Sequence, residues 1–181
     1  MLGRVASPVE SLQNSMLPIL DDIGILLRRE LEGLRREIAL FPDDSVLWAT
    51  PAGVANSAGN LALHIAGNLQ HFIGHELGGL PYRRDREREF GQREGSRAEV
   101  IDEVDRTLAA VADVLPRLTS DKLAAAFGAH AEVRVPTQRF LLHLCTHTAF
   151  HVGQVGYLRR ILTGDARSTD TLSARRLDPG Q

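Results

Sequence analysis

The stretch that decides the fold is Leu141-Leu-His-Leu-Cys-Thr-His-Thr-Ala-Phe-His-Val-Gly-Gln-Val-Gly-Tyr-Leu-Arg-Arg160, an apolar run that carries His143, His147 and His151 four residues apart. In an α-helix a four-residue step turns by about 400°, so the three imidazoles project from one face. His143 and His151 are separated by about 12 Å along the axis, too far for both to reach one metal ion through bonds of about 2 Å. The stretch therefore predicts a helix that supplies two metal ligands, either His143 with His147 or His147 with His151.

Three other segments carry apolar residues at steps of three and four, the spacing of one buried helical face. We expect helices at about 15–40 and 57–77, a third that opens at the Ser96-Arg-Ala-Glu99 capping box and runs to about 118, and a fourth at 137–163. The two later connections each span about 18 residues, which permits a crossover. This pattern predicts an all-α four-helix bundle, with residues 1–165 as one domain and 166–181 as a disordered polar tail.

Composition excludes several classes of protein. The chain has 181 residues, 43% apolar and 24% charged, with a net charge of −2, which suits one soluble domain and gives no general attraction for nucleic acid or an anionic membrane. Cys145 is the only cysteine, so no disulfide can form within the chain, and a reducing compartment is the simplest interpretation. The first residues lack the apolar core of a signal peptide and no 18-residue apolar run occurs, so we expect a cytoplasmic protein without a membrane span.

A third ligand would have to come from another part of the chain, where the candidates are His64, His71, His75 and His130. His71 and His75 are themselves four residues apart, so spacing alone nominates them as readily as a pair on the last helix. They lie beside Glu76 and two glycines near a helix end, whereas His64 lies between two apolar residues next to the buried face. The sequence favours His64 and leaves the others open.

A buried histidine is more often a core residue bonded to a carbonyl or carboxylate than a metal ligand. Two histidines on an inward face, with another available on a facing helix, shift the interpretation towards a metal site. No Glu-x-x-His of the di-iron proteins occurs, and Thr148 stands where a metalloprotease helix has its catalytic glutamate. The Arg-rich connection at 80–95 interleaves acids with its bases, which favours a solvated linker over an anion site.

Two motifs make the chain similar to the DinB superfamily, also called DinB/YfiT-like. The last helix of that family carries His-x-x-x-His followed by Gly-Gln, which matches His147-Thr-Ala-Phe-His151-Val-Gly153-Gln154. Its second helix carries one histidine after a Ser-x-Gly-Asn-Leu opening, which matches Ser57-Ala-Gly-Asn-Leu-Ala-Leu-His64. The resemblance covers residues 17–162 and departs at Val152, where many relatives have a basic residue, so no anion contact is expected there.

The resemblance implies an up-down-down-up bundle with a long crossover, a homodimer, and a divalent metal, zinc or nickel, on His64, His147 and His151. Characterised relatives include thiol S-transferases that use bacillithiol or mycothiol and a mycothiol-dependent isomerase. We therefore expect a small-molecule substrate and a metal-dependent transferase or hydrolase-like activity, in which an open metal position binds a low-molecular-weight thiol or water. Gln154 would orient a ligand or the substrate, and His143 would pack or hydrogen-bond one turn below the site. The alternative is a metal-binding or dimeric interaction protein without turnover, because no Asp or Glu is placed as a general base.

Overall fold

The computed structural model describes residues 17–128 and 134–178, and throughout these ranges the regular structure is helical, without a β-strand. An isolated bridge between Ala126 and Pro136 is the one β-type pairing in this part of the chain. The predicted all-α class is therefore confirmed. None of the helices within these ranges is long and apolar enough to cross a membrane.

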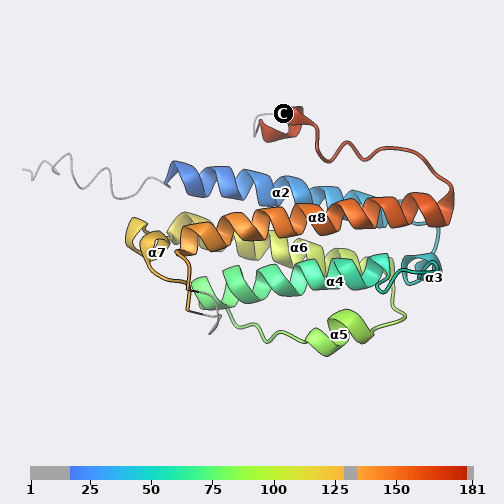
Figure 1. Cartoon of the computed structure of the whole chain (residues 1–181), viewed down its shortest axis with the longest axis horizontal. Coiled ribbons are helices and arrows are strands. Elements are labelled where there is room, and N and C mark those ends of the chain that lie inside the picture. Colours follow the sequence, from blue (N-terminus) through green and yellow to red (C-terminus); the bar gives the residue numbers. More distant parts are fainter. Residues whose placement is uncertain (1–16, 129–133, 179–181) are drawn as a thin grey trace, which may run out of the picture.

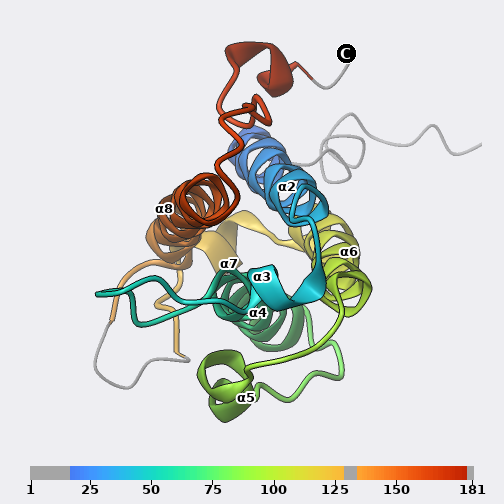
Figure 2. The ribbon, with the colours of Figure 1, turned by 90° about the vertical axis from the view of Figure 1, so that its right-hand side faces the viewer.

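Long helices lie side by side and enclose the core: α2 (Pro18–Ala39), α4 (Ala58–Leu69), α6 (Arg97–Val114) and α8 (Thr137–Thr163). Shorter elements connect and extend them: α3 (Asp44–Leu47), the π-helix η1 (Gln70–Leu77), α5 (Arg86–Gly91), the 3-10 helix η2 (Leu115–Arg117), α7 (Ser120–Ala124) and the 3-10 helix η3 (Ala174–Leu177). In Figure 1, α2 and α8 run from left to right, whereas α4 and α6 run from right to left. The end-on view in Figure 2 shows these four helices around a common interior, with α5 on the outer side of α4.

Helix α2 buries one face, as its apolar spacing predicts. The buried residues recur every three or four positions, from Leu20 at the start to Ile38 at the end. Pro18 occupies the first turn, where its missing N–H leaves no helical bond unmade. Residues 15 and 16, which the predicted helix includes, lie outside the described ranges.

Capping boxes set the starts of α6 and α4. The hydroxyl of Ser96 accepts from the backbone N–H of Glu99 at 3.2 Å, and the carboxylate of Glu99 accepts from the backbone N–H of Ser96 at 2.9 Å, so the predicted box is confirmed. At α4, Ser57 and Asn60 make the same reciprocal pair at 3.1 and 3.2 Å. Here Asn60 takes the place that glutamate or glutamine has in the usual pattern.

The predicted helix at 57–77 changes its winding after Leu69. Residues Gln70–Leu77 form a π-helix, and its last turn includes a bond from the Gly78 N–H to the oxygen of Ile73 at 3.0 Å. The backbone closes on α6 at this point, because a side chain on Gly78 would collide with Val114. Apolar spacing does not distinguish a π-helix from an α-helix, so the prediction was right about a helix and wrong about its winding.

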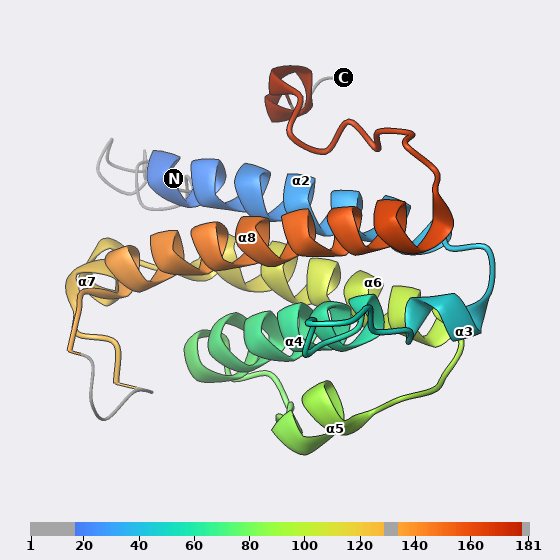
Figure 3. The same ribbon diagram turned by 45° about the vertical axis from the view of Figure 1, so that its right-hand side comes forward.

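The chain after α8 returns along α2, as Figures 1 and 3 show. Arg159 of α8 is fully buried and donates to the carboxylate of Glu37 on α2 and to two backbone oxygens of the segment that follows α8. Thr171 occupies the space that a side chain on Gly33 would need, so this segment packs on the α2 backbone. The disorder expected for 166–181 concerns motion in solution and stays a prediction.

Candidate metal centre

Three histidines meet between α4 and α8, two helices that Figure 3 shows side by side. His64 comes from α4, His147 and His151 come from successive turns of α8, and one nitrogen of each lies within 4.8 Å of the others. The Nε2 atoms of His64 and His147 are 3.2 Å apart. Two nitrogens bound to a tetrahedral zinc at about 2.0–2.1 Å are about 3.3 Å apart, so this separation suits a shared ion. The structure brings together His147 with His151, rather than His143 with His147, and adds His64.

The surroundings of the two rings on α8 favour neutral imidazoles, the form that binds metals. His64 is buried, with 7% of its surface exposed, whereas His147 and His151 are half-buried. Burial, reinforced by the neighbouring imidazoles and by Arg84, lowers the pKa of His147 from 6.5 to about 4. Burial also lowers the pKa of His151. Because both pKa values lie below the ordinary value, protons compete little for these two rings at neutral pH.

Two of the rings are held by hydrogen bonds at Nδ1. His64 donates to the carboxylate of Glu89 at 2.9 Å, and His151 donates to the side-chain oxygen of Gln154 at 2.7 Å. An oxygen acceptor at Nδ1 keeps the proton there and leaves the lone pair on Nε2. The Nδ1 of His147 is buried and has no hydrogen-bond partner among the described residues. Three converging imidazoles, two of them oriented in this way, fit a divalent metal ion that keeps a further position for another ligand.

The connection at 80–95 contributes to this site, which the sequence did not predict. Glu89 is buried and Arg84 is largely covered, and the two side chains make two hydrogen bonds, Nε to Oε1 at 2.7 Å and Nη2 to Oε2 at 2.9 Å. Burial raises the pKa of Glu89, but hydrogen bonds from His64 and Arg84 outweigh burial and hold this pKa below its usual value. The interpretation of this segment as a solvated linker is therefore wrong for these two residues, because interleaved charges in a sequence do not reveal which of them pair inside the fold.

The remaining histidines lie outside the cluster. His143 is exposed and its ring centre is 5.9 Å from that of His147, so it neither belongs to the core nor joins the three-nitrogen site. His71 and His75 stack at 6.1 Å within η1, where His75 donates to a backbone oxygen at 2.9 Å. His130 lies outside the described residues.

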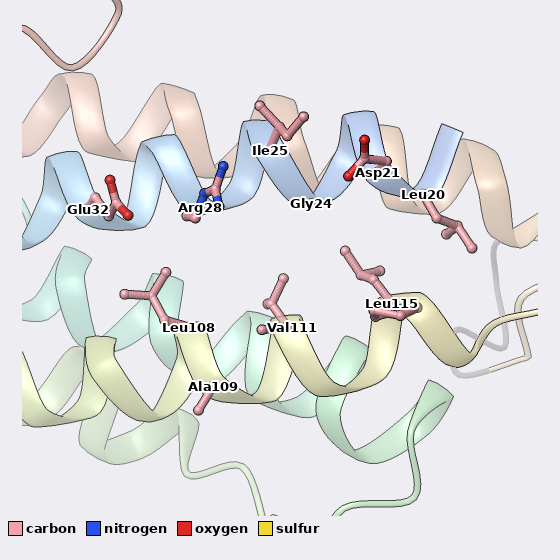
Figure 4. A pocket seen from close by; sticks show the side chains of 12 residues that line it. Leu20, Asp21, Gly24, Ile25, Arg28, Glu32, Leu108, Ala109, Val111 and Leu115 are labelled. Carbon is pink, nitrogen blue, oxygen red and sulfur yellow. The ribbon is translucent and has the colours of Figure 1, made fainter. Parts of the chain in front are cut away.

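Two cavities differ in their relation to the cluster. One of about 490 Å³ lies between α2 and α6, where Figure 4 shows apolar side chains such as Leu108 and Leu115, and no clustered histidine lines it. The other, of about 420 Å³, is bounded by residues 53–56, α4 and α8. Gln154 lines this second cavity and also bonds His151, so the second cavity adjoins the cluster through one hydrogen bond.

Fold and site together define an all-helical protein built around a cluster of histidines between two long helices. The chain belongs to the DinB superfamily, whose family model matches residues 26–155, and the resemblance stated from the motifs is confirmed. A crystal structure of a conserved protein from Enterococcus faecalis is similar in fold, with a TM-score of 0.65 and 18% identity, over 88% of this chain and 100% of that chain. No curated protein matches the sequence.

Proposed function

We propose that the chain binds one divalent metal ion, zinc or nickel, through His64, His147 and His151. The observation that carries this proposal is the convergence of three imidazole nitrogens, with a 3.2 Å separation between Nε2 of His64 and Nε2 of His147. The hydrogen bonds that hold His64 and His151 at Nδ1 support it further. In keeping with the family, we infer that the four long helices form its up-down-down-up bundle, with the connection from η1 to α6 as the long crossover.

A divalent ion in such a site lowers the pKa of a bound thiol or water and so makes a nucleophile available at neutral pH. The nearby carboxylate of Glu89 is not placed as a general base, because it contacts His64 at Nδ1 while Nε2 faces His147. Thiol transfer needs no strong base, because a thiolate is ionised and still nucleophilic. The site therefore favours an S-transferase that uses a low-molecular-weight thiol over a hydrolase.

We assign substrate binding to the cavity beside Gln154. Its walls include the apolar side chains of Val54, Leu61 and Ile161 together with the ring of Tyr157. Apolar walls with two side-chain amides, those of Asn56 and Gln154, suit the apolar part of a small electrophile. Gln154 then has two roles, which are to orient His151 from Nδ1 and to border the bound substrate.

The second candidate function is that of a metal-binding or dimeric interaction protein without turnover. The outer face of α8 exposes Phe150, Tyr157 and Ile161, at 64%, 71% and 63% of their surfaces. Apolar side chains gathered along one exposed helix face are typical of a surface that binds another protein. A second copy of this chain, in a homodimer, is the partner that we propose for this face.

Activity with thiols separates the two candidates. The metal-loaded protein is incubated with bacillithiol, mycothiol or glutathione and with monochlorobimane as the electrophile, beside the variant His147→Ala. The transferase assignment predicts, for at least one thiol, a rate above that of the variant. If no thiol exceeds the rate of the variant and none alters the spectrum of the metal, the non-enzymatic function is the one to adopt.

A further inference from the structure

The short helix α5 is fastened to the helix that carries His64. The side-chain amide of Asn60 donates to the backbone oxygen of Glu89 at 3.0 Å and to that of Gln92 at 2.9 Å. Asn60 is buried and lies one turn before His64 on α4, where its side-chain oxygen also caps the helix. The position of Glu89 relative to His64 is therefore set by hydrogen bonds to α4 itself.

Helix α4 leaves room for the carboxylate of Glu89 at Gly67, three residues after His64. A Cβ atom on residue 67 would lie 2.3 Å from Oε1 of Glu89 and 3.0 Å from its Cδ. A methyl group at this position therefore cannot coexist with the carboxylate where it now lies. Glycine lowers the stability of a helix interior, and the space that it leaves for Glu89 accounts for its presence here.

Arg84 closes the other side of the carboxylate. Its two hydrogen bonds to Glu89 occupy both carboxylate oxygens, and its guanidinium carbon lies 5.7 Å from the ring centre of Phe72. Its Nη2 also lies 3.3 Å from Nδ1 of His64, farther than the Glu89 oxygen at 2.9 Å. Arg84 supplies the compensating charge for a buried carboxylate, so the pair does not depend on a metal for its balance. An ionised carboxylate can only accept hydrogen bonds, so the proton of His64 lies on Nδ1 and its Nε2 lone pair faces His147.

We propose that Glu89 is a positioning residue of the metal centre: seated on Gly67 and held by Arg84, it fixes the tautomer and the ring orientation of His64. This inference rests on the proposed metal-binding function and deepens it. A carboxylate behind a ligating histidine raises the basicity of that ligand, and its loss typically costs about 10- to 100-fold in metal affinity. The consequence for this chain is that Gly67, which offers no ligand atom, controls the affinity through the space that it leaves.

The test compares two glycine-to-alanine substitutions in the full-length, untagged protein. In Gly67→Ala the new methyl group overlaps the position of the Glu89 carboxylate. In Gly74→Ala the new methyl group meets Ala110 and Leu80 at ordinary contact distances of 3.6 and 3.7 Å. Zinc affinity is measured by competition with a chromophoric chelator, after circular dichroism has established that each variant is folded. We expect Gly67→Ala and Glu89→Gln each to weaken zinc binding by about 10- to 100-fold, and Gly74→Ala to stay within about twofold of the parent.

A second measurement does not depend on metal. Nitrogen-15 NMR of the metal-free protein reports which nitrogen of His64 carries the proton, and we expect Nδ1–H in the parent and in Gly74→Ala. Gly67→Ala and Glu89→Gln should show a mixture with the Nε2–H form. A folded Gly67→Ala or Glu89→Gln protein that keeps both the parental zinc affinity and the pure Nδ1–H form overturns the positioning role. A parent protein that binds neither zinc nor nickel overturns the metal-binding function instead, and the NMR comparison then still decides whether Glu89 fixes His64.

Discussion

The α4–α5 side and the α8 side of the histidine cluster hold their rings in different ways. On the α4–α5 side, His64 is buried and donates to Glu89, a carboxylate that is itself paired with Arg84. On the α8 side, His151 is half-buried and donates to the neutral amide of Gln154, an exposed residue three positions further along the same helix. Both arrangements place the ring proton on Nδ1 and leave the lone pair of Nε2 for a metal ion.

The ring of His64 is held by segments that are distant in the sequence, whereas the ring of His151 is held by a residue of its own helix. The contact between His151 and Gln154 depends only on α8 remaining helical. The buried charge pair behind His64 depends on α4, residue 84 and α5 being assembled together. We therefore expect the α4–α5 side to set stability and metal affinity, and the α8 side to adjust them.

Removal of one partner of the buried pair should give the largest effect. The variant Arg84→Met leaves the carboxylate of Glu89 buried without a compensating charge, and we expect the free energy of unfolding to fall by about 3–5 kcal/mol. Arg35, which pairs with Asp105 at the surface, provides the matched control, because Arg35→Met should cost at most about 1 kcal/mol. Chemical denaturation of the metal-free proteins measures both changes. Equal losses in the two variants would contradict a special role for the buried pair.

Substitution on the α8 side should have a smaller effect on metal binding. Gln154→Ala removes a neutral acceptor that water can replace at an exposed position, so we expect zinc affinity to fall by less than about tenfold. The same chelator competition that measures Glu89→Gln gives this value. A loss as large as that in Glu89→Gln would remove the asymmetry between the two sides.

The pH dependence of stability tests His147, which faces both sides of the cluster. Its pKa is lowered to about 4 in the folded chain, whereas the ordinary value of 6.5 applies to the unfolded chain. Between pH 6.5 and about 4, His147 is protonated in the unfolded chain but stays neutral in the folded chain. This contribution to stability is therefore present above pH 6.5 and is lost as the pH falls towards 4.

Thermal unfolding of the metal-free protein across this pH range, beside the variant His147→Gln, isolates the effect. We expect the unfolding temperature of the parent to fall more steeply than that of the variant, which has no group to protonate at this position. If the unfolding temperatures of the two proteins fall in parallel with pH, His147 titrates at its ordinary pKa. That result would contradict a half-buried ring that stays neutral.

Features that follow a period along the chain could be predicted from the sequence. The apolar residues of α2 recur at helical spacing, and His147 and His151 share a face because four residues separate them. His64 was favoured by its apolar neighbours and implied by the family resemblance, and the structure brings it to the same place.

Features that depend on how the chain folds back could not be predicted in this way. Glu89 follows His64 by 25 residues, and nothing in the charged run 80–95 distinguishes its buried acid from the solvated ones. Gly67 was the one available signal, because a glycine inside a predicted helix indicates that a neighbour approaches closely. It does not indicate which neighbour, and only the assembled fold identifies Glu89.

The metal content of the protein tests the central claim most directly. The chain is purified without a histidine tag and without a nickel column, and its metals are measured by mass spectrometry beside those of His147→Ala. We expect about one divalent ion per chain in the parent and no stoichiometric metal in the variant, because the loss of His147 leaves only two of the three imidazoles that converge. Full occupancy in the His147→Ala protein would contradict the assignment of a metal to this cluster.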